Sequence, residues 1–205
     1  MSMATLSEQE LVRRSKLEAL KKLAINPYPA ALYPVDFFAS SLPEAYEEGK
    51  KVVVAGRIMS RRIQGKASFA ELLDPTGKIQ LYLNRDEMCS GEDKTLYNEV
   101  YKKLLDIGDI IGVEGTLFTT KVGQMSINVN QLTVLNKSLK PLPLPKTDSE
   151  GNTYDEFNDP EQRYRQRYVD LIVNPKVKDT FLKRTQITNE IRHFLTDEGY
   201  LEVET

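Results

Sequence analysis

Phe69 and Gln80 are the side chains whose types and spacing could do chemistry in this sequence. They lie on two short runs that alternate apolar and polar residues and are joined by Asp74-Pro75-Thr76-Gly77. Proline at the second and glycine at the fourth position of this joint favour a type I turn, so the runs predict an antiparallel hairpin. If Leu73 pairs with Lys78, Phe69 and Gln80 become diagonal neighbours on the polar face.

An aromatic ring, an amide and arginines on one face suit a nucleobase that is turned out of its stack. The ring offers a stacking surface, the amide reads a base edge, and a guanidinium holds phosphate. In a regular strand Arg57 and Arg61 would share a face, and Arg62 would point the other way unless a bulge at Gly56 re-aims it. The same residues also fit a simpler interpretation, in which Phe69 packs under a neighbouring loop and the arginines are solvated charges.

Five alternating runs and one helical pattern would build the scaffold for this face. Three strands fill Val52–Asn84, with a first turn at Gln64-Gly65-Lys66, and a helix follows over about 94–105. Two further strands, Ile110–Thr119 and Met125–Asn136, flank a turn at Val122-Gly123-Gln124. Three strands, a helix and two strands is the order of an OB-fold barrel, whose outer face on strands 2 and 3 commonly binds oligonucleotides. We therefore expect a mainly β fold with helices, built on a five-stranded OB-fold barrel.

The rest of the sequence predicts further segments around this barrel. A helix over 7–24 opens with the capping box Ser7 and Glu10 and carries a basic flank that is either a solvated face or an RNA contact. The expected divisions are an N-terminal helical extension (1–50), the barrel domain (51–137), a polar, proline-containing linker (138–159) and a second unit (160–205). In that unit we expect helices over about 161–171 and 176–198, and a strand after Gly199.

Composition bounds the class of protein. The 205 residues are 40% hydrophobic and 28% charged, with a net charge of −2, which argues against a nonspecific DNA-coating protein but allows a local basic patch. Cys89 is the single cysteine, so the chain has no internal disulfide framework and no multi-cysteine zinc site, which fits a cytoplasmic protein. The sequence lacks an apolar run of membrane-spanning length and the apolar core of a signal peptide.

Three segments together resemble a known family. They are Gly65-Lys66-Ala67-Ser68-Phe69, the run from Arg163 to Leu171, and the ending Gly199-Tyr200-Leu201-Glu202-Val203-Glu204-Thr205. With the barrel order, they resemble a bacterial-type class II lysyl-tRNA synthetase over essentially the whole chain. The resemblance implies an anticodon-binding OB domain, followed by the truncated start of the α+β catalytic domain, namely the helix and strand of class II motif 1. Because one helix and one strand cannot bury a core, we expect the sequence to be the front part of a longer protein.

The resemblance also implies roles for five residues. Phe69 corresponds to the aromatic residue that stacks on the central anticodon base, a uridine in lysine tRNA, and Gln80 to the residue that hydrogen-bonds this base. Arg61 and Arg62 correspond to an arginine pair near the anticodon. Gln124 stands where the family often has a glutamate that helps to read the anticodon. No catalytic, cofactor-binding or metal-binding residue is expected in this sequence.

The implied partners follow from the same resemblance. The fragment would bind lysine tRNA, whereas the full-length enzyme would also use lysine, ATP and Mg²⁺ and would form a homodimer through motif 1. Motifs 2 and 3, which hold ATP and lysine in the family, are not in this sequence, so we expect the chain alone not to aminoacylate tRNA. The alternatives are an aspartyl- or asparaginyl-tRNA synthetase, a non-enzymatic module that binds single-stranded nucleic acid, and an assembly fragment that works through residues 160–205.

Overall fold

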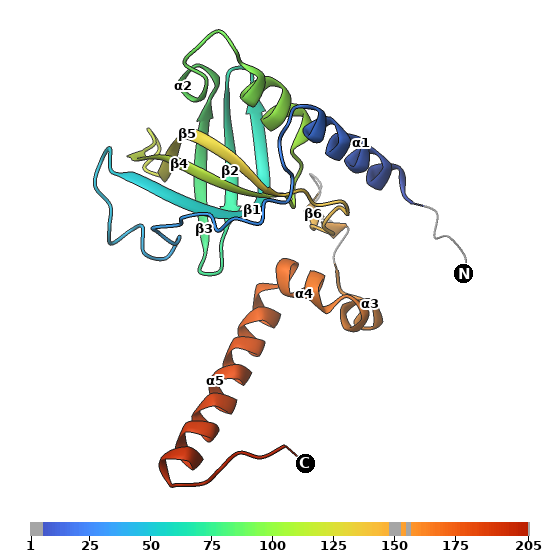
Figure 1. Ribbon diagram of the computed structural model, residues 1–205, viewed down its shortest axis with the longest axis vertical. Helices are drawn as coiled ribbons and strands as arrows, with labels where there is room; N and C mark the ends of the chain where they lie inside the picture. The colour runs from blue at the N-terminus through green and yellow to red at the C-terminus, as the bar shows by residue number, and fades with distance from the viewer. Residues whose placement is uncertain (1–5, 148–152, 155–156, 205) are drawn as a thin grey trace. The chain divides into compact units, whose positions relative to one another are not determined.

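Five strands pair into a closed barrel, and the apolar residues that alternate along them face its interior (Figure 1). The strands are β1 (Lys51–Gln64), β2 (Ala67–Leu73), β3 (Lys78–Asn84), β4 (Ile110–Thr119) and β5 (Met125–Asn136). Around the barrel they follow the order β1-β2-β3-β5-β4, and the pairing of β4 with β1 closes the ring. Only the pair β3 and β5 is parallel among these neighbours. The predicted five-stranded OB-fold barrel is confirmed, including the bounds of β4 and β5.

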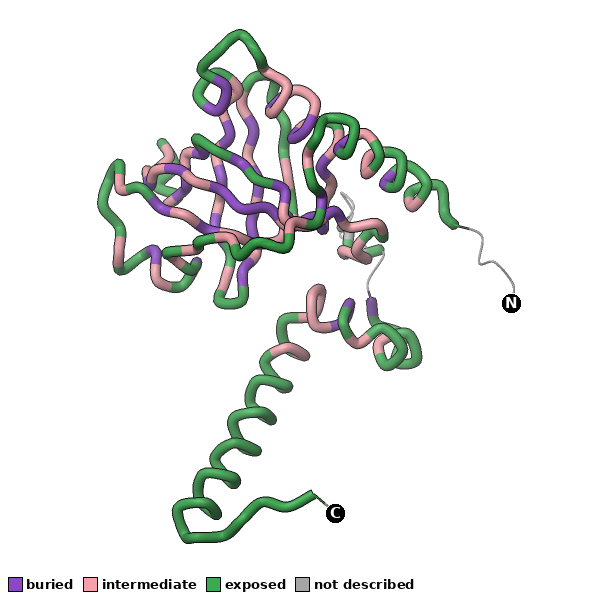
Figure 2. The backbone as a smooth tube through the Cα atoms, in the orientation of Figure 1, coloured by how far each residue is buried: buried purple, intermediate pink, exposed green. Residues whose placement is uncertain are grey.

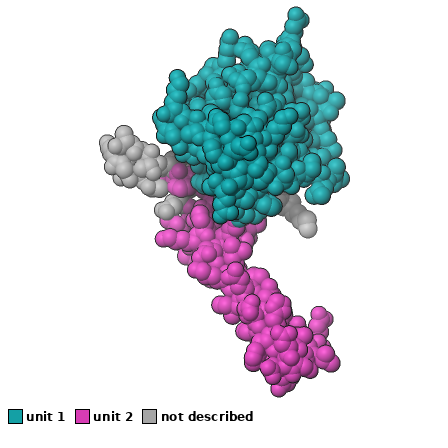
Figure 3. Space-filling model, turned by 90° about the vertical axis from the view of Figure 1, so that its left-hand side faces the viewer, with its two compact units in different colours: residues 1–141 teal, residues 142–205 magenta. Residues whose placement is uncertain are grey.

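The structure is a computed structural model that describes residues 6–147, 153–154 and 157–204. The chain divides into two compact units, residues 1–141 and 142–205 (Figure 3). In addition to the barrel, the first unit contains the helix α1 (Glu8–Lys22), the short helix α2 (Arg85–Met88) and the π-helix η1 (Leu96–Leu104). The second unit contains β6 (Lys146–Thr147), β7 (Thr153–Tyr154), α3 (Pro160–Arg165), α4 (Arg167–Val173) and α5 (Pro175–Asp197). The predicted linker residues 148–152, 155 and 156 lie outside the described residues.

The barrel core is mainly aliphatic, and every strand contributes side chains to it. Buried and part-buried residues alternate along β2 and β3, as a strand with one face on a core requires (Figure 2). The buried side chains from these two strands are Ala70, Leu72, Ile79, Leu81 and Leu83. Phe69, Glu71, Gln80 and Tyr82 therefore stand on the outer face, as the alternation predicts.

The register of the β2–β3 hairpin is the predicted one. Leu73 pairs with Lys78 and Glu71 with Gln80. Asp74 holds the turn, because its carboxylate accepts hydrogen bonds from the backbone N–H groups of Ala39 (2.6 Å), Thr76 (2.7 Å) and Gly77 (2.8 Å). Burial alone would raise the pKa of Asp74, but these donors together lower the pKa below its usual value.

A β-bulge in β1 decides which arginine faces outward. Ile58 pairs with Leu72, but Ser60 pairs with Glu71, so the register between β1 and β2 shifts at this point. The shift places Arg62 opposite Phe69 on the outer face and Arg61 opposite the buried Ala70. The prediction that Arg57 and Arg61 share a face is therefore wrong, because the extra residue inverts the alternation between them. A bulge does re-aim Arg62, but it lies after Ile58 rather than at Gly56.

Two basic side chains of helix α1 bind it to the residues that flank the barrel strands. Its predicted capping box is confirmed, since Ser7 and Glu10 exchange hydrogen bonds. The guanidinium of Arg13 donates to the carbonyl oxygens of Ile107 (2.9 Å) and Ser138 (3.1 Å), and Lys16 forms an ion pair with Asp106 (2.5 Å). These contacts turn part of the basic flank of α1 toward the barrel.

The second unit differs from its prediction in two places. The predicted helix over 161–171 is broken at Gln166, which separates α3 from α4. The strand predicted after Gly199 does not form. Residues 200–204 are described, and they lie in no strand. A strand needs a hydrogen-bonded partner, and none of the described residues pairs with this segment. Helix α5 has no buried residue, and most of its apolar side chains, including Ile187 and Phe194, are exposed.

Candidate nucleic-acid interface

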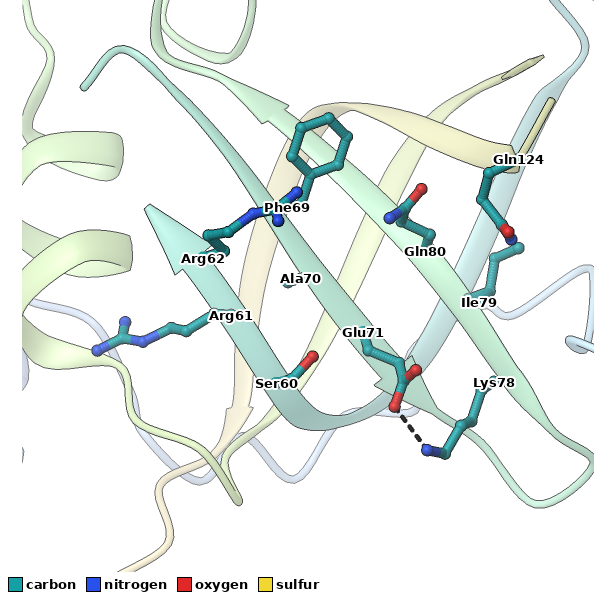
Figure 4. Close-up of a pocket in the computed structure, with 10 residues that line it drawn as sticks. All are labelled: Ser60, Arg61, Arg62, Phe69, Ala70, Glu71, Lys78, Ile79, Gln80 and Gln124. Atoms are coloured by element: carbon teal, nitrogen blue, oxygen red, sulfur yellow. Dashed lines mark ion pairs between the residues drawn. The ribbon is translucent and has the colours of Figure 1, made fainter. Parts of the chain in front are cut away.

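A groove of about 460 Å³ lies on the outer face of β1, β2 and β3 (Figure 4). The turn between β4 and β5 borders one side of this groove with Gln124. All five residues that the sequence singles out line it. The lining residues are Ser60, Arg61, Arg62, Phe69, Ala70, Glu71, Lys78, Ile79, Gln80 and Gln124.

Phe69 presents an aromatic surface that its neighbours hold in place. The centroid of its ring lies 5.2 Å from that of Tyr82, its partner across the β2–β3 pair, and the two rings are tilted by 51°. Tyr82 in turn contacts the edge of Phe118 on β4, with the centroids 5.8 Å apart. A side chain that is packed on one side and borders a groove on the other can receive a flat ring, as base stacking requires.

Gln80 is oriented by a residue that the sequence interpretation missed. The hydroxyl of Ser126 on β5 donates to the amide oxygen of Gln80, with 2.8 Å between the oxygens. Ser126 lies opposite Gln80 in the parallel β3–β5 pair and has no exposed surface. Figure 4 shows the amide nitrogen of Gln80 on the side that faces Phe69 and the oxygen turned away from it. The amide therefore offers hydrogen-bond donors to the groove.

Gln124 lies in the turn that ends beside the groove. Its backbone N–H donates to the hydroxyl of Thr120 (3.0 Å), and Gly123 adopts a positive φ of 82°, which closes the turn. The side chain of Gln124 is exposed and makes a 3.4 Å contact from its amide nitrogen to the carbonyl oxygen of Met125. It is thus available to a bound molecule as both a donor and an acceptor.

The two arginines have different surroundings. The guanidinium carbon of Arg62 lies 5.7 Å from the centroid of the Phe69 ring, within the range of a cation–π contact. The guanidinium of Arg61 instead donates to the carbonyl oxygen of Tyr101 at the barrel-facing helix η1 (2.7 Å), and Figure 4 shows it directed away from Phe69. Arg62 is the arginine beside the aromatic surface.

A surface ion pair lies at the other end of the groove. The ammonium of Lys78 lies 2.7 Å from a carboxylate oxygen of Glu71, and both side chains are partly exposed (Figure 4). The alternation of β2 and β3 could have placed this pair beside Gln80. Ser126 could not be found in this way, because its position depends on the register of a parallel pair between strands that are distant in sequence.

Metal-ligating side chains do not cluster in the described residues. Among residues 6–147, 153–154 and 157–204, no group of three or more histidine, cysteine, aspartate or glutamate side chains could hold a metal ion. None of the helices among these described residues has the length and hydrophobicity of a membrane-spanning segment. The groove offers stacking, hydrogen bonding and positive charge instead.

Comparisons with known proteins match both units of the chain. The model of the OB-fold nucleic acid binding domain matches residues 52–135, and the model of the class II tRNA synthetases (D, K and N) matches residues 159–205. The first match contains every residue that lines the groove.

Similar curated proteins agree with these two matches. A lysine–tRNA ligase of Christiangramia forsetii is 64% identical over 99% of this chain, and one of Porphyromonas gingivalis is 51% identical over 100% of this chain. A lysine–tRNA ligase of Azobacteroides pseudotrichonymphae is 54% identical over 98% of the chain. The chain spans 36% of the first two relatives and 40% of the third.

Proposed function

Because this chain belongs to the class II lysine–tRNA ligases, we propose that its barrel recognises the anticodon of lysine tRNA in the groove beside Phe69. The observation that carries the proposal is the juxtaposition of an aromatic ring, an oriented amide and a guanidinium on one outer barrel face. Phe69 stacks on the central anticodon uridine, Gln80 hydrogen-bonds its edge, and Arg62 attracts the adjoining phosphate. Gln124 contacts a neighbouring anticodon base from the β4–β5 turn.

The chemistry of single-stranded RNA recognition supports these roles. An anticodon loop splays its bases outward, so a protein can reach both the face and the edge of a base. Phe69 and Gln80 are diagonal neighbours on adjacent strands, so one base in the groove could stack on the ring of Phe69 and place its edge at the amide of Gln80. A net charge of −2 does not prevent this binding, since the local charge at the groove decides the attraction to phosphate.

Binding to anticodon stem-loops tests the proposal. We expect the chain to bind the lysine-tRNA stem-loop about tenfold or more tightly than a stem-loop whose central uridine is replaced by cytidine, since reading one base edge is worth about 1–3 kcal/mol. Fluorescence anisotropy at one fixed salt concentration measures both affinities. Equal binding to the two loops would favour a nonspecific single-strand module instead.

One further stem-loop separates a lysine-specific from an asparagine-specific parent protein. The class II match covers all three specificities, so the family model alone does not choose between them. The asparagine-tRNA stem-loop keeps the central uridine and differs at the first anticodon base. Tighter binding of this loop than of the lysine loop would support an asparagine-specific parent and contradict the proposed specificity.

The two arginines should respond differently to substitution. Arg62→Ala should reduce the slope of log K against log salt by about one unit, as expected for a lost phosphate contact. Arg61→Ala should leave this slope unchanged and lower the thermal stability, because it removes the hydrogen bond to the Tyr101 carbonyl oxygen. Salt titrations and thermal unfolding of both variants check the assignment. The reverse pattern would assign the phosphate contact to Arg61.

The remaining roles belong to the whole enzyme. We propose that the parent protein joins lysine to its tRNA in the cytoplasm, with ATP and Mg²⁺ as in its class, and that it forms a homodimer through the segment that contains α5. The support is the class II match over 159–205 and the lysine–tRNA ligase relatives, of which this chain spans about a third. We propose that the chain alone forms no lysyl-adenylate, because motifs 2 and 3, which hold ATP and lysine in the family that the chain resembles, are not in this sequence.

A further inference from the structure

We propose that Ser126 is a positioning residue that makes anticodon reading selective for uridine over cytidine. It does so by fixing which end of the Gln80 amide faces the RNA. This inference rests on the proposed function, because it concerns the same groove and the same base. It adds a residue outside the groove lining, on a strand that supplies none of the predicted contacts.

The geometry gives Ser126 control of the amide. A glutamine amide carries an acceptor on one side and two donors on the other, and the two ends have nearly the same shape. The hydroxyl of Ser126 donates to the oxygen end of Gln80 at 2.8 Å. In this arrangement the nitrogen end lies away from Ser126, and Figure 4 shows it on the side of Phe69. A base stacked on Phe69 would meet donors and not an acceptor.

Ser126 itself is held in a defined position. Its side chain has no exposed surface, so water does not compete for its proton. The same hydroxyl has a second acceptor, the carbonyl oxygen of Gln124, at the longer distance of 3.3 Å. Ser126 thereby links the two amide residues of the groove, since it contacts the backbone of Gln124 and the side chain of Gln80. The pairing of β3 with β5 sets this position.

The polarity of the amide decides between the two pyrimidines. Uracil presents the acceptor O4 at the edge position where cytosine presents an amino donor. Amide donors facing the base can bond to O4 of uracil, whereas they meet a second donor on cytosine. An amide that is free to rotate could accept from the cytosine amino group, and the discrimination would then fall.

Four variants of the chain test the inference with the stem-loops that carry a central uridine or cytidine. Ser126→Ala removes the hydroxyl and should reduce the preference for uridine by about fivefold, the effect of one hydrogen bond, chiefly by improving binding to the cytidine loop. Ser126→Thr retains a hydroxyl and should retain the preference. Gln80→Met removes both ends of the amide, and adding Ser126→Ala to Gln80→Met should then leave the ratio of the two affinities unchanged.

The outcomes separate this inference from the proposed function. A wild-type chain without preference for uridine would overturn the proposed function. A wild-type preference that persists unchanged in Ser126→Ala would overturn the role of Ser126 and leave the function intact. A purely structural role for Ser126 would lower both affinities by the same factor and leave their ratio at the wild-type value. A change of the ratio that also occurs in the Gln80→Met background would show that Ser126 acts without the amide. Either result would contradict the inference, and circular dichroism confirms that each variant is folded.

Discussion

Replacement of Phe69 by alanine should weaken binding of the lysine-tRNA anticodon stem-loop by about tenfold or more, since stacking of one base contributes about 1–3 kcal/mol. The ring borders the groove, and the contacts with Tyr82 and Arg62 hold its orientation before RNA binds. A preorganised surface of this kind loses little conformational entropy on binding, so most of the stacking energy should appear in the affinity. Fluorescence anisotropy of the labelled stem-loop measures the change.

Two matched variants identify the source of the loss. Phe69→Leu keeps apolar volume on the strand but removes the aromatic face, so its affinity should fall nearly as far as that of Phe69→Ala. Phe38→Ala removes a phenyl ring that is 48% exposed and lies outside the groove lining, so its affinity should be unchanged. If Phe69→Leu bound as tightly as the wild type, stacking would not be the contribution of this residue.

Replacement of Lys137 by methionine should lower the free energy of unfolding of the barrel by about 3–5 kcal/mol, because it leaves the buried carboxylate of Asp109 without its cation. The side chain of Lys137 is fully buried directly after β5. Its ammonium lies 2.6 Å from a carboxylate oxygen of Asp106 and 2.7 Å from one of Asp109. Asp109 is buried as well, and it also accepts from the backbone N–H groups of Asp106 and Ser138, both at 2.8 Å.

The consequence should extend to helix α1, because Asp106 also pairs with Lys16 on that helix. Urea unfolding followed by circular dichroism measures the loss. Lys103→Met is a matched control, because Lys103 forms a pair of the same length, 2.6 Å, with Glu99 at the surface. Its removal should cost about 0–1 kcal/mol. Adding Asp109→Asn to Lys137→Met should recover part of the stability, and a Lys137→Met chain as stable as the control would refute the buried network.

The predicted part of the candidate site depended on local patterns. Alternation and one proline- and glycine-containing turn were sufficient to put Phe69 and Gln80 on the same outer face, because a two-strand register follows directly from its turn. The capping box of α1 and the bounds of β4 and β5 followed in the same way from residues close in sequence. The roles of these residues in RNA binding remain predictions.

The β1 bulge and the tail of the second unit show where such patterns are insufficient. A bulge depends on how β1 pairs with β2, and the residue types between Ile58 and Ser60 do not predict one. The strand expected after Gly199 requires a partner strand, which apolar alternation cannot supply. The break at Gln166 likewise interrupts a helix that its apolar spacing predicted to be continuous.

The sequence by itself determined the five strands, their order along the chain and the aromatic–amide pair on one face, because these depend on neighbours along the chain and on period-two burial. Only the tertiary structure decided that Arg62 rather than Arg61 lies beside Phe69, that Lys137 is buried between two carboxylates, and that Ser126 orients Gln80. Each of these contacts joins residues on different elements, and its geometry exists only once the strands have paired and the barrel has closed.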